Sequence, residues 1–223
     1  MNSSLKAVLF DLDGVLTNTV PLHYKANKML AEDLGVSFDH EMNMKLQGRS
    51  RMDAIEALLK QKEESYSYEE KLKLGEQRNT YYQALIEDLS PEDLLPGVKD
   101  FLEQTRAADF KAVLTSSSTN ARTVISNVGI KNYFDHIVDV HTISNRKPDP
   151  EIFLKGAEMA GVSPKECAGI EDSEAGIRAL QSAGIFSVGV GEEQAAREAD
   201  WFVDSTRELQ VDALIQRFNE RNG

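Results

Sequence analysis

The 223-residue chain has little cysteine, few aromatic residues and no excess of positive charge. Its single cysteine, Cys167, excludes an intramolecular disulfide, so we expect the reducing cytoplasm. No apolar run approaches the roughly 20 residues that cross a bilayer, and we expect neither a signal peptide nor a membrane partner. A net charge of -12 argues against nucleic acid as a partner. An anionic ligand would therefore need a metal ion or a few well-placed cations.

Two carboxylates follow the apolar run of residues 7–10, which is typical of a buried strand in a parallel sheet. Ligands of such sheets bind just outside the carboxyl ends of the strands. Asp11 and Asp13 are therefore placed for phosphoryl chemistry, in which the first attacks and the second handles a proton. The alternative is that Asp11-Leu12-Asp13-Gly14 only ends a strand and begins a turn.

Apolar segments after this first strand alternate with helical ones. Strands are expected at residues 110–114, 136–140, 168–170 and 187–190, with amphipathic helices between them. This alternation predicts an α/β fold with a doubly wound parallel sheet.

The region from about residue 20 to residue 89 shows helical periodicity and no convincing strand. Its apolar stripes fall within residues 22–34, 55–59 and 82–89. We therefore predict a core domain of residues 1–17 and 90–223 with an α-helical cap domain of residues 18–89 inserted into it. The two links between the cap and the core are both expected to lie beside the carboxylates. This position favours a lid over a subdomain that only adds stability.

Polar residues also follow the other predicted strands: Thr115 to Ser118, then Lys147 in a loop, then Glu171 and Asp172. Each alone is explained by a turn, a helix start or a solvated loop. Together they converge on one edge of the sheet, and their carboxylates repel one another unless a cation binds. Oxygen ligands suit Mg²⁺. A serine hydroxyl and Lys147 would hold a phosphate there.

These residues resemble four ordered motifs of the haloacid dehalogenase superfamily of aspartate-nucleophile phosphotransferases. The motifs are residues 10–15, 114–116, 147–148 and 169–173. Within it, the chain is most similar to the β-phosphoglucomutase-like subfamily, through His23 and residues 13–19, 48–51, 116–118 and 147–153. This resemblance implies a Rossmann-like core, Mg²⁺ as the cofactor and a small sugar phosphate as the substrate.

The resemblance also implies roles for individual residues. Asp11 would be the nucleophile and Asp13 the general acid and base. The metal ligands would be Asp11, the Asp13 carbonyl, Glu171 and Asp172, and the transferring phosphate would contact Ser116, Ser117 and Lys147. The remaining substrate and cap residues would be Thr19, His23, Gly48, Arg51, Arg78, Asn79 and Asn120. Without the resemblance, His23 would be an ordinary hinge histidine and Arg51 a solvated helix residue.

The leading hypothesis is a Mg²⁺-dependent mutase that interconverts β-D-glucose 1-phosphate and glucose 6-phosphate through an aspartyl phosphate and a hexose bisphosphate. The alternative is a phosphatase of the same family that hydrolyses a small sugar phosphate. A phosphoacceptor domain fits less well, because it would need neither Asp13 nor the cap. A dehalogenase fits less well, because it would need neither Asp13 nor the metal ligands Glu171 and Asp172. Asn18, Gln47, Arg49 and Arg78 depart from the mutase pattern and bear on the choice of sugar. We expect a monomer.

Overall fold

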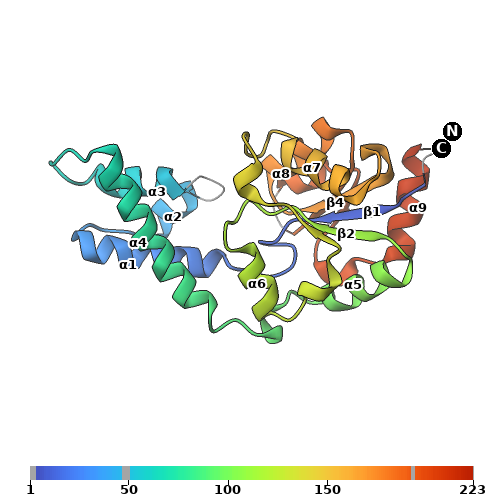
Figure 1. Ribbon diagram of the computed structural model, residues 1–223, viewed down its shortest axis with the longest axis horizontal. Helices are drawn as coiled ribbons and strands as arrows, with labels where there is room; N and C mark the ends of the chain where they lie inside the picture. Colours follow the sequence, from blue (N-terminus) through green and yellow to red (C-terminus); the bar gives the residue numbers. More distant parts are fainter. Residues whose placement is uncertain (1–3, 47–50, 192–193, 223) are drawn as a thin grey trace. The chain divides into compact units, whose positions relative to one another are not determined.

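A computed structural model of the chain describes residues 4–46, 51–191 and 194–222. It contains two compact units: Met1–Asn18 with Ser90–Gly223, which we call the core, and Thr19–Leu89, which we call the cap (Figure 1). The observed division follows Asn18, whereas the expected one followed Thr17.

The core is built on a parallel six-stranded sheet with the order β3-β2-β1-β4-β5-β6, so the predicted fold class is confirmed. The first strand lies in the middle of the sheet, where both of its neighbours are parallel to it. The strands are β1 (Ala7–Phe10), β2 (Lys111–Leu114), β3 (His136–Ile137), β4 (Cys167–Glu171), β5 (Phe186–Val190) and β6 (Trp201–Val203).

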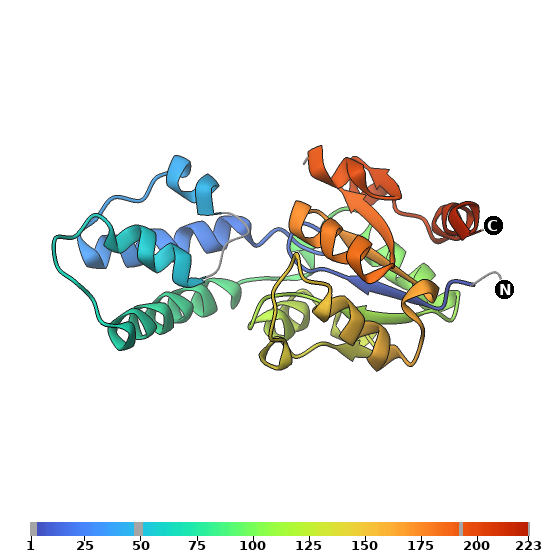
Figure 2. The same ribbon diagram turned by 90° about the horizontal axis from the view of Figure 1, so that it is seen from above.

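Alternate residues of β1 pack on opposite faces of the sheet, which explains why the run is apolar throughout. Leu9 belongs to a buried cluster with Phe153 and Leu180. Phe10 meets Phe101 edge to face, with ring centroids 6.1 Å apart. Helices accordingly cover both faces: α7 and α8 lie on one, and α5 and α9 on the other (Figures 1 and 2). The core helices are α5 (Val98–Ala107), α6 (Ala121–Asn127), α7 (Glu151–Ala160), α8 (Glu174–Ala183) and α9 (Val211–Asn222).

The cap is helical in the part of it that the structure describes. Its apolar centre is a cluster that includes Leu30, Ile55 and Leu58. The first helix ends at Gly35, whose φ of 66° is the left-handed conformation favoured at such ends. The last begins with a capping box, in which Ser67 and Glu70 each bond the other's backbone N–H. The helices are α1 (Val20–Leu34), α2 (His40–Leu46), α3 (Arg51–Leu59) and α4 (Tyr68–Ile86).

Within the core, the segments on either side of the inserted cap are bonded to each other. Thr17 is buried, and its hydroxyl donates to the carbonyl of Asp93 over 2.6 Å. The Leu95 N–H donates to the Leu16 carbonyl over 3.0 Å, and Thr17 forms an antiparallel bridge with Leu94. The chain therefore leaves and re-enters the core through two segments held side by side.

Four elements differ from the sequence prediction. The strand expected at residues 136–140 stops at Ile137, and β6 and α9 were not predicted. In the cap, α2 was not predicted either, and none of its residues is buried. None of the helices among the described residues combines the length and the apolar character needed to span a membrane.

Candidate active site

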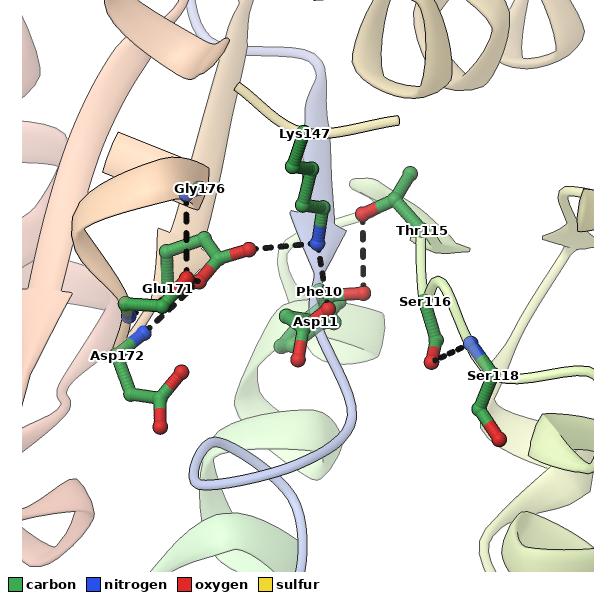
Figure 3. A network of polar contacts seen from close by, with 10 residues as sticks. Phe10, Asp11, Thr115, Ser116, Ser118, Lys147, Glu171, Asp172 and Gly176 are labelled. Carbon is green, nitrogen blue, oxygen red and sulfur yellow. Dashed lines mark hydrogen bonds and ion pairs between the residues drawn. The ribbon is translucent and has the colours of Figure 1, made fainter. Parts of the chain in front are cut away.

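Functional side chains gather at the carboxyl ends of three neighbouring strands (Figure 3). Asp11 directly follows β1, Ser116 lies two residues beyond β2, and Glu171 is the last residue of β4. Because β1 pairs in parallel with both β2 and β4, these three ends meet at one edge of the sheet. The structure thus brings together the core residues that the sequence placed at strand ends.

Lys147 lies between two of the carboxylates, as Figure 3 shows. Its Nζ is 2.5 Å from Asp11 Oδ1 and 2.6 Å from Glu171 Oε1, and all three side chains are at most 11% exposed. Burial alone lowers the pKa of an amine, but the charges of Asp11 and Glu171 outweigh it and raise the pKa of Lys147. The lysine therefore stays protonated and compensates charge that is otherwise buried.

The second oxygen of Glu171 joins the end of β4 to the start of α8. Oε2 accepts hydrogen bonds from the backbone N–H groups of Asp172 and Ser173 and from the Ser173 hydroxyl. Ser173 caps α8 by accepting from the Gly176 N–H. A Cβ on Gly176 would lie 1.9 Å from the Glu171 carboxyl carbon, so only glycine leaves room for this carboxylate. Both oxygens of Glu171 thus have protein donors.

The acidic residues form a cluster that could hold a metal ion. One oxygen from each of Asp11, Glu171 and Asp172 lies within 4.8 Å of the others. Gly14 adopts a φ of +75°, and a Cβ there would come within 1.9 Å of Asp172 Oδ2. The turn after β1 therefore has the one residue that admits the Asp172 carboxylate beside it. An all-oxygen donor set fits a hard cation such as Mg²⁺.

Burial raises the pKa values of both aspartates. The pKa of Asp11 rises to about 6, chiefly because burial disfavours its charge, although Lys147 opposes the rise. The pKa of Asp13 rises to about 7, first through burial and then through the charge of Asp11. A carboxyl group with a pKa near neutrality can both give and take a proton at working pH. Asp13 has this property.

The loop between β2 and α6 contains the predicted phosphate-binding residues. Ser116 is buried, and its Oγ accepts from the Ser118 N–H over 3.1 Å. Ser117 is exposed and lines a cavity of about 70 Å³ that Lys147 also lines. Asn120, expected among the substrate and cap residues, lies in the core, where its N–H donates to Ser118 Oγ. Ser116, Ser117 and Asn120 thus share one loop.

The other predicted substrate residues lie in the cap. Thr19 is buried just before α1, and its carbonyl accepts from the His23 N–H. Arg51 donates to Asn79 Oδ1 over 2.9 Å, so these two residues contact each other. Arg78 is buried and contacts His23. Gly48 lies outside the described residues.

Sequence reasoning missed several residues that hold these groups in place. Asn27 and Tyr82 contact Arg78 and His23 in the cap. Thr115 was named in the sequence only as part of a motif after a strand. In the structure it joins β2 to β1, because its N–H and hydroxyl both donate to the Phe10 carbonyl. Ser173 was part of the fourth motif, and a serine before an acidic residue and an apolar stripe is also typical of a helix start.

Comparisons with known proteins agree with this arrangement. Residues 5–184 match the family model described as haloacid dehalogenase-like hydrolase. The chain is 44% identical to β-phosphoglucomutase of Bacillus subtilis over 97% of this chain and 96% of the relative. It is 30% identical to a phosphorylated carbohydrates phosphatase of Thermotoga maritima, over 81% of this chain and 82% of the relative.

A solved structure extends the likeness to three dimensions. The crystal structure of β-phosphoglucomutase from Clostridium difficile superimposes with a TM-score of 0.90 at 41% sequence identity. The match covers 97% of this chain and 98% of that one.

Proposed function

This chain belongs to the haloacid dehalogenase-like hydrolase family, and from that premise we propose that it is a β-phosphoglucomutase. It would interconvert β-D-glucose 1-phosphate and glucose 6-phosphate. The observation that carries the proposal is the 44% identity to a β-phosphoglucomutase over nearly the whole of both chains. The Asp11, Lys147 and Glu171 network supplies the groups that this chemistry needs.

In the proposed reaction, a carboxylate oxygen of Asp11 attacks the phosphorus of a hexose bisphosphate. The bond between phosphorus and the sugar oxygen breaks, and Asp13 gives that oxygen a proton. Asp13 then takes a proton from a hydroxyl of the next sugar phosphate, whose oxygen attacks the aspartyl phosphate. Asp11 is regenerated and a new bisphosphate forms. The pKa of Asp13, near 7, suits both proton transfers.

The transferring phosphoryl group would be held by Lys147 and Ser116. Lys147 keeps its charge and lies 2.5 Å from the attacking carboxylate, so it can compensate negative charge on the phosphoryl oxygens. Its bond to Glu171 fixes the amine from the other side. Ser117, in the same loop as Ser116, is exposed and can contact the phosphate too.

We propose Mg²⁺ as the cofactor. Asp11, Asp172 and the main-chain carbonyl of Asp13 would bind it, with Glu171 beside them holding Lys147 and the start of α8. When bound, Mg²⁺ supplies charge neutralisation for phosphoryl transfer. Gly14 supports this proposal, because it leaves space for the Asp172 carboxylate.

The cap would bind the rest of the sugar phosphate. Arg51 is suited to the phosphate that is not being transferred, because a guanidinium can give two hydrogen bonds to one phosphate. Asn79 would orient Arg51 through the bond that joins them. Closure of the cap would keep water from the aspartyl phosphate. A cytoplasmic location and a monomeric state stay predictions.

A sugar-phosphate phosphatase is the second candidate. It is favoured by the 30% identity to a phosphorylated carbohydrates phosphatase, a relative of which 82% is covered. The first step would be identical. Water, in place of a sugar hydroxyl, would then attack the aspartyl phosphate and release inorganic phosphate.

Phosphorus NMR distinguishes the two. The purified protein is given Mg²⁺, β-glucose 1-phosphate and a trace of glucose 1,6-bisphosphate, and both glucose 6-phosphate and free phosphate are followed. Glucose 6-phosphate without matching free phosphate supports the mutase, and free phosphate as the main product supports the phosphatase. No reaction would reject glucose phosphates as substrates. The Asp11→Asn variant serves as the control for contaminating activity.

A further inference from the structure

Four cap residues form a tight cluster between α1 and α4. Arg78 Nη2 lies 3.0 Å from His23 Nδ1, and the same nitrogen donates to the His23 carbonyl over 3.2 Å. Arg78 Nε donates to Asn27 Oδ1 over 2.8 Å. The guanidinium is thus attached to α1 at three points. With a residue exposure of 7%, Arg78 presents little surface to a ligand.

The Arg78 contact fixes which nitrogen of His23 has the proton. A guanidinium has five N–H donors and no acceptor. Nδ1 must therefore offer a lone pair to Arg78, and in a neutral ring the proton lies on Nε2. An imidazolium would instead point its Nδ1–H at an N–H of Arg78. The contact thus excludes both the other tautomer and the charged ring while it lasts.

The surroundings of the ring also disfavour its charged form. The ring of Tyr82 is stacked on that of His23, with centroids 4.1 Å apart and planes 1° from parallel. The charged groups acting on the ring are Arg78 of α4 and Arg51 of α3. Burial, followed by these two positive charges, lowers the pKa of His23 to about 3. Geometry and charge therefore favour the same form.

We propose that Arg78 is a positioning residue that holds His23 as its neutral Nε2–H tautomer, so that His23 serves the reaction as a hydrogen-bond donor and never as a proton acceptor. This inference rests on the proposed function. It leaves Asp13 as the group that moves protons, and it replaces the expectation that Arg78 binds substrate. Asn27 also positions His23 indirectly, because its bond to Arg78 Nε orients the guanidinium.

The direct test is nitrogen-15 NMR of the full-length protein with labelled histidine and Mg²⁺. The chain has four histidines, and the His23 signals are assigned by their loss in His23→Asn. We expect the shift of a bare ring nitrogen for Nδ1 and of a protonated one for Nε2, unchanged between about pH 5 and 8. A protonated Nδ1, or a titration of His23 in that range, would overturn the proposal.

A pair of variants tests the part played by Arg78. Arg78→Met removes the donor, whereas Arg78→Lys keeps one. In Arg78→Met we expect mixed tautomers, a His23 pKa that moves toward its ordinary value of about 6.5, and a kcat lower by about 10-fold to 100-fold. The pH profile of kcat gains an ionisation while KM stays close to that of the natural protein. Arg78→Lys should restore the tautomer and most of kcat.

A rise in KM with unchanged kcat in Arg78→Met would show instead that Arg78 binds substrate, and the proposal would fail. The signals of His40 in the cap and of His136 in the core report whether each unit stays folded in the variants. If Arg78→Met does not fold, the tautomer of the natural protein and of Arg78→Lys decides the matter. The tautomer is read without turnover, so a protein with a bare Nδ1 and no mutase activity would reject the proposed function alone.

Discussion

In the core, Lys147 pairs with two of three clustered carboxylates, whereas in the cap Arg51 and Arg78 donate to amide, carbonyl and imidazole groups. In the core, Lys147 compensates only part of the buried negative charge. Burial therefore still raises the pKa values of Asp11 and Asp13. In the cap, burial, followed by the positive charges of Arg78 and Arg51, lowers the pKa of His23, so that its ring is neutral. In the proposed reaction, the core thus transfers protons and the phosphoryl group, and the cap binds anions without moving protons.

The largest expected effect is on Asp11, the proposed nucleophile of the core. Asp11→Asn should reduce turnover about ten-thousandfold or more, because the amide cannot attack phosphorus. Steady-state assays with β-glucose 1-phosphate measure the loss. Asp212→Asn, at an exposed position in α9, is the matched control and should keep full activity. If Asp11→Asn kept a tenth of the activity, the core would not supply the nucleophile that the comparison assumes.

Removing the lysine tests charge compensation within the core. Lys147→Met leaves Asp11 and Glu171 buried without their cation, and it should lower the free energy of unfolding by about 3–5 kcal/mol at neutral pH. Urea unfolding in EDTA measures this difference. Lys155→Met breaks an exposed pair with Glu158 and should cost at most about 1 kcal/mol. Equal losses in the two variants would contradict a compensated core site.

The cap should respond differently from the core. Arg51→Met should raise KM for β-glucose 1-phosphate by about 10-fold to 150-fold, which corresponds to lost hydrogen bonds to a charged group worth about 1.5–3 kcal/mol. The value of kcat should change much less than in Asp11→Asn. Lys45→Met, on the exposed helix α2, is the control for loss of one positive charge. A fall in kcat at constant KM in Arg51→Met would contradict the assignment of binding to the cap and of chemistry to the core.

The dependence of stability on pH and on Mg²⁺ tests the buried charges of the core. In EDTA, the folded protein binds more protons than the unfolded chain between about pH 4 and 7, because the pKa of Asp11 is about 6 and that of Asp13 about 7 against an ordinary 3.8. Stability should therefore fall as pH rises through that window, by about 1.4 kcal/mol for each unit of pKa shift at most. Mg²⁺ should oppose the fall. Thermal unfolding of Asp13→Asn should show a smaller decline, and an identical decline would contradict these assignments.

The smallest expected effect is confined to the cap. Ser67→Ala removes half of the capping box that begins α4 and should destabilise that helix by about 1 kcal/mol. Hydrogen exchange should become faster for the amides of α4 and α1, while those of β1 and β4 keep their rates. Equal acceleration in both units would mean that core and cap unfold as one cooperative body.

The sequence predicted the parts of the fold where one local pattern dominates. The run of residues 7–10 is apolar throughout because both faces of β1 are covered, and its polar end places Asp11. The strand at residues 136–140 was predicted too long because Asp139 accepts from the His141 N–H and begins a 3₁₀ turn. The short strand β6 and the helix α2, which buries no residue, offer almost no periodic signal.

Site residues followed the same rule. Asp11, Lys147 and Glu171 were predicted because each lies in a recognisable motif at or after a strand. The bond between Arg78 and His23 joins residues 55 positions apart. No local pattern encodes such a contact, since it depends on how α1 packs against α4. The sequence therefore identified both residues but not their relationship.

The bonds that join Thr17 to Asp93 and Leu16 to Leu95 have a consequence for protein engineering. They fix the two ends of the insertion against each other inside the core, whatever helices lie between them. A chimaera that exchanges residues 19–89 for the corresponding segment of another family member would keep the same entry and exit points. Substrate choice could thus be recombined as a cassette while the phosphoryl-transfer residues stay in place.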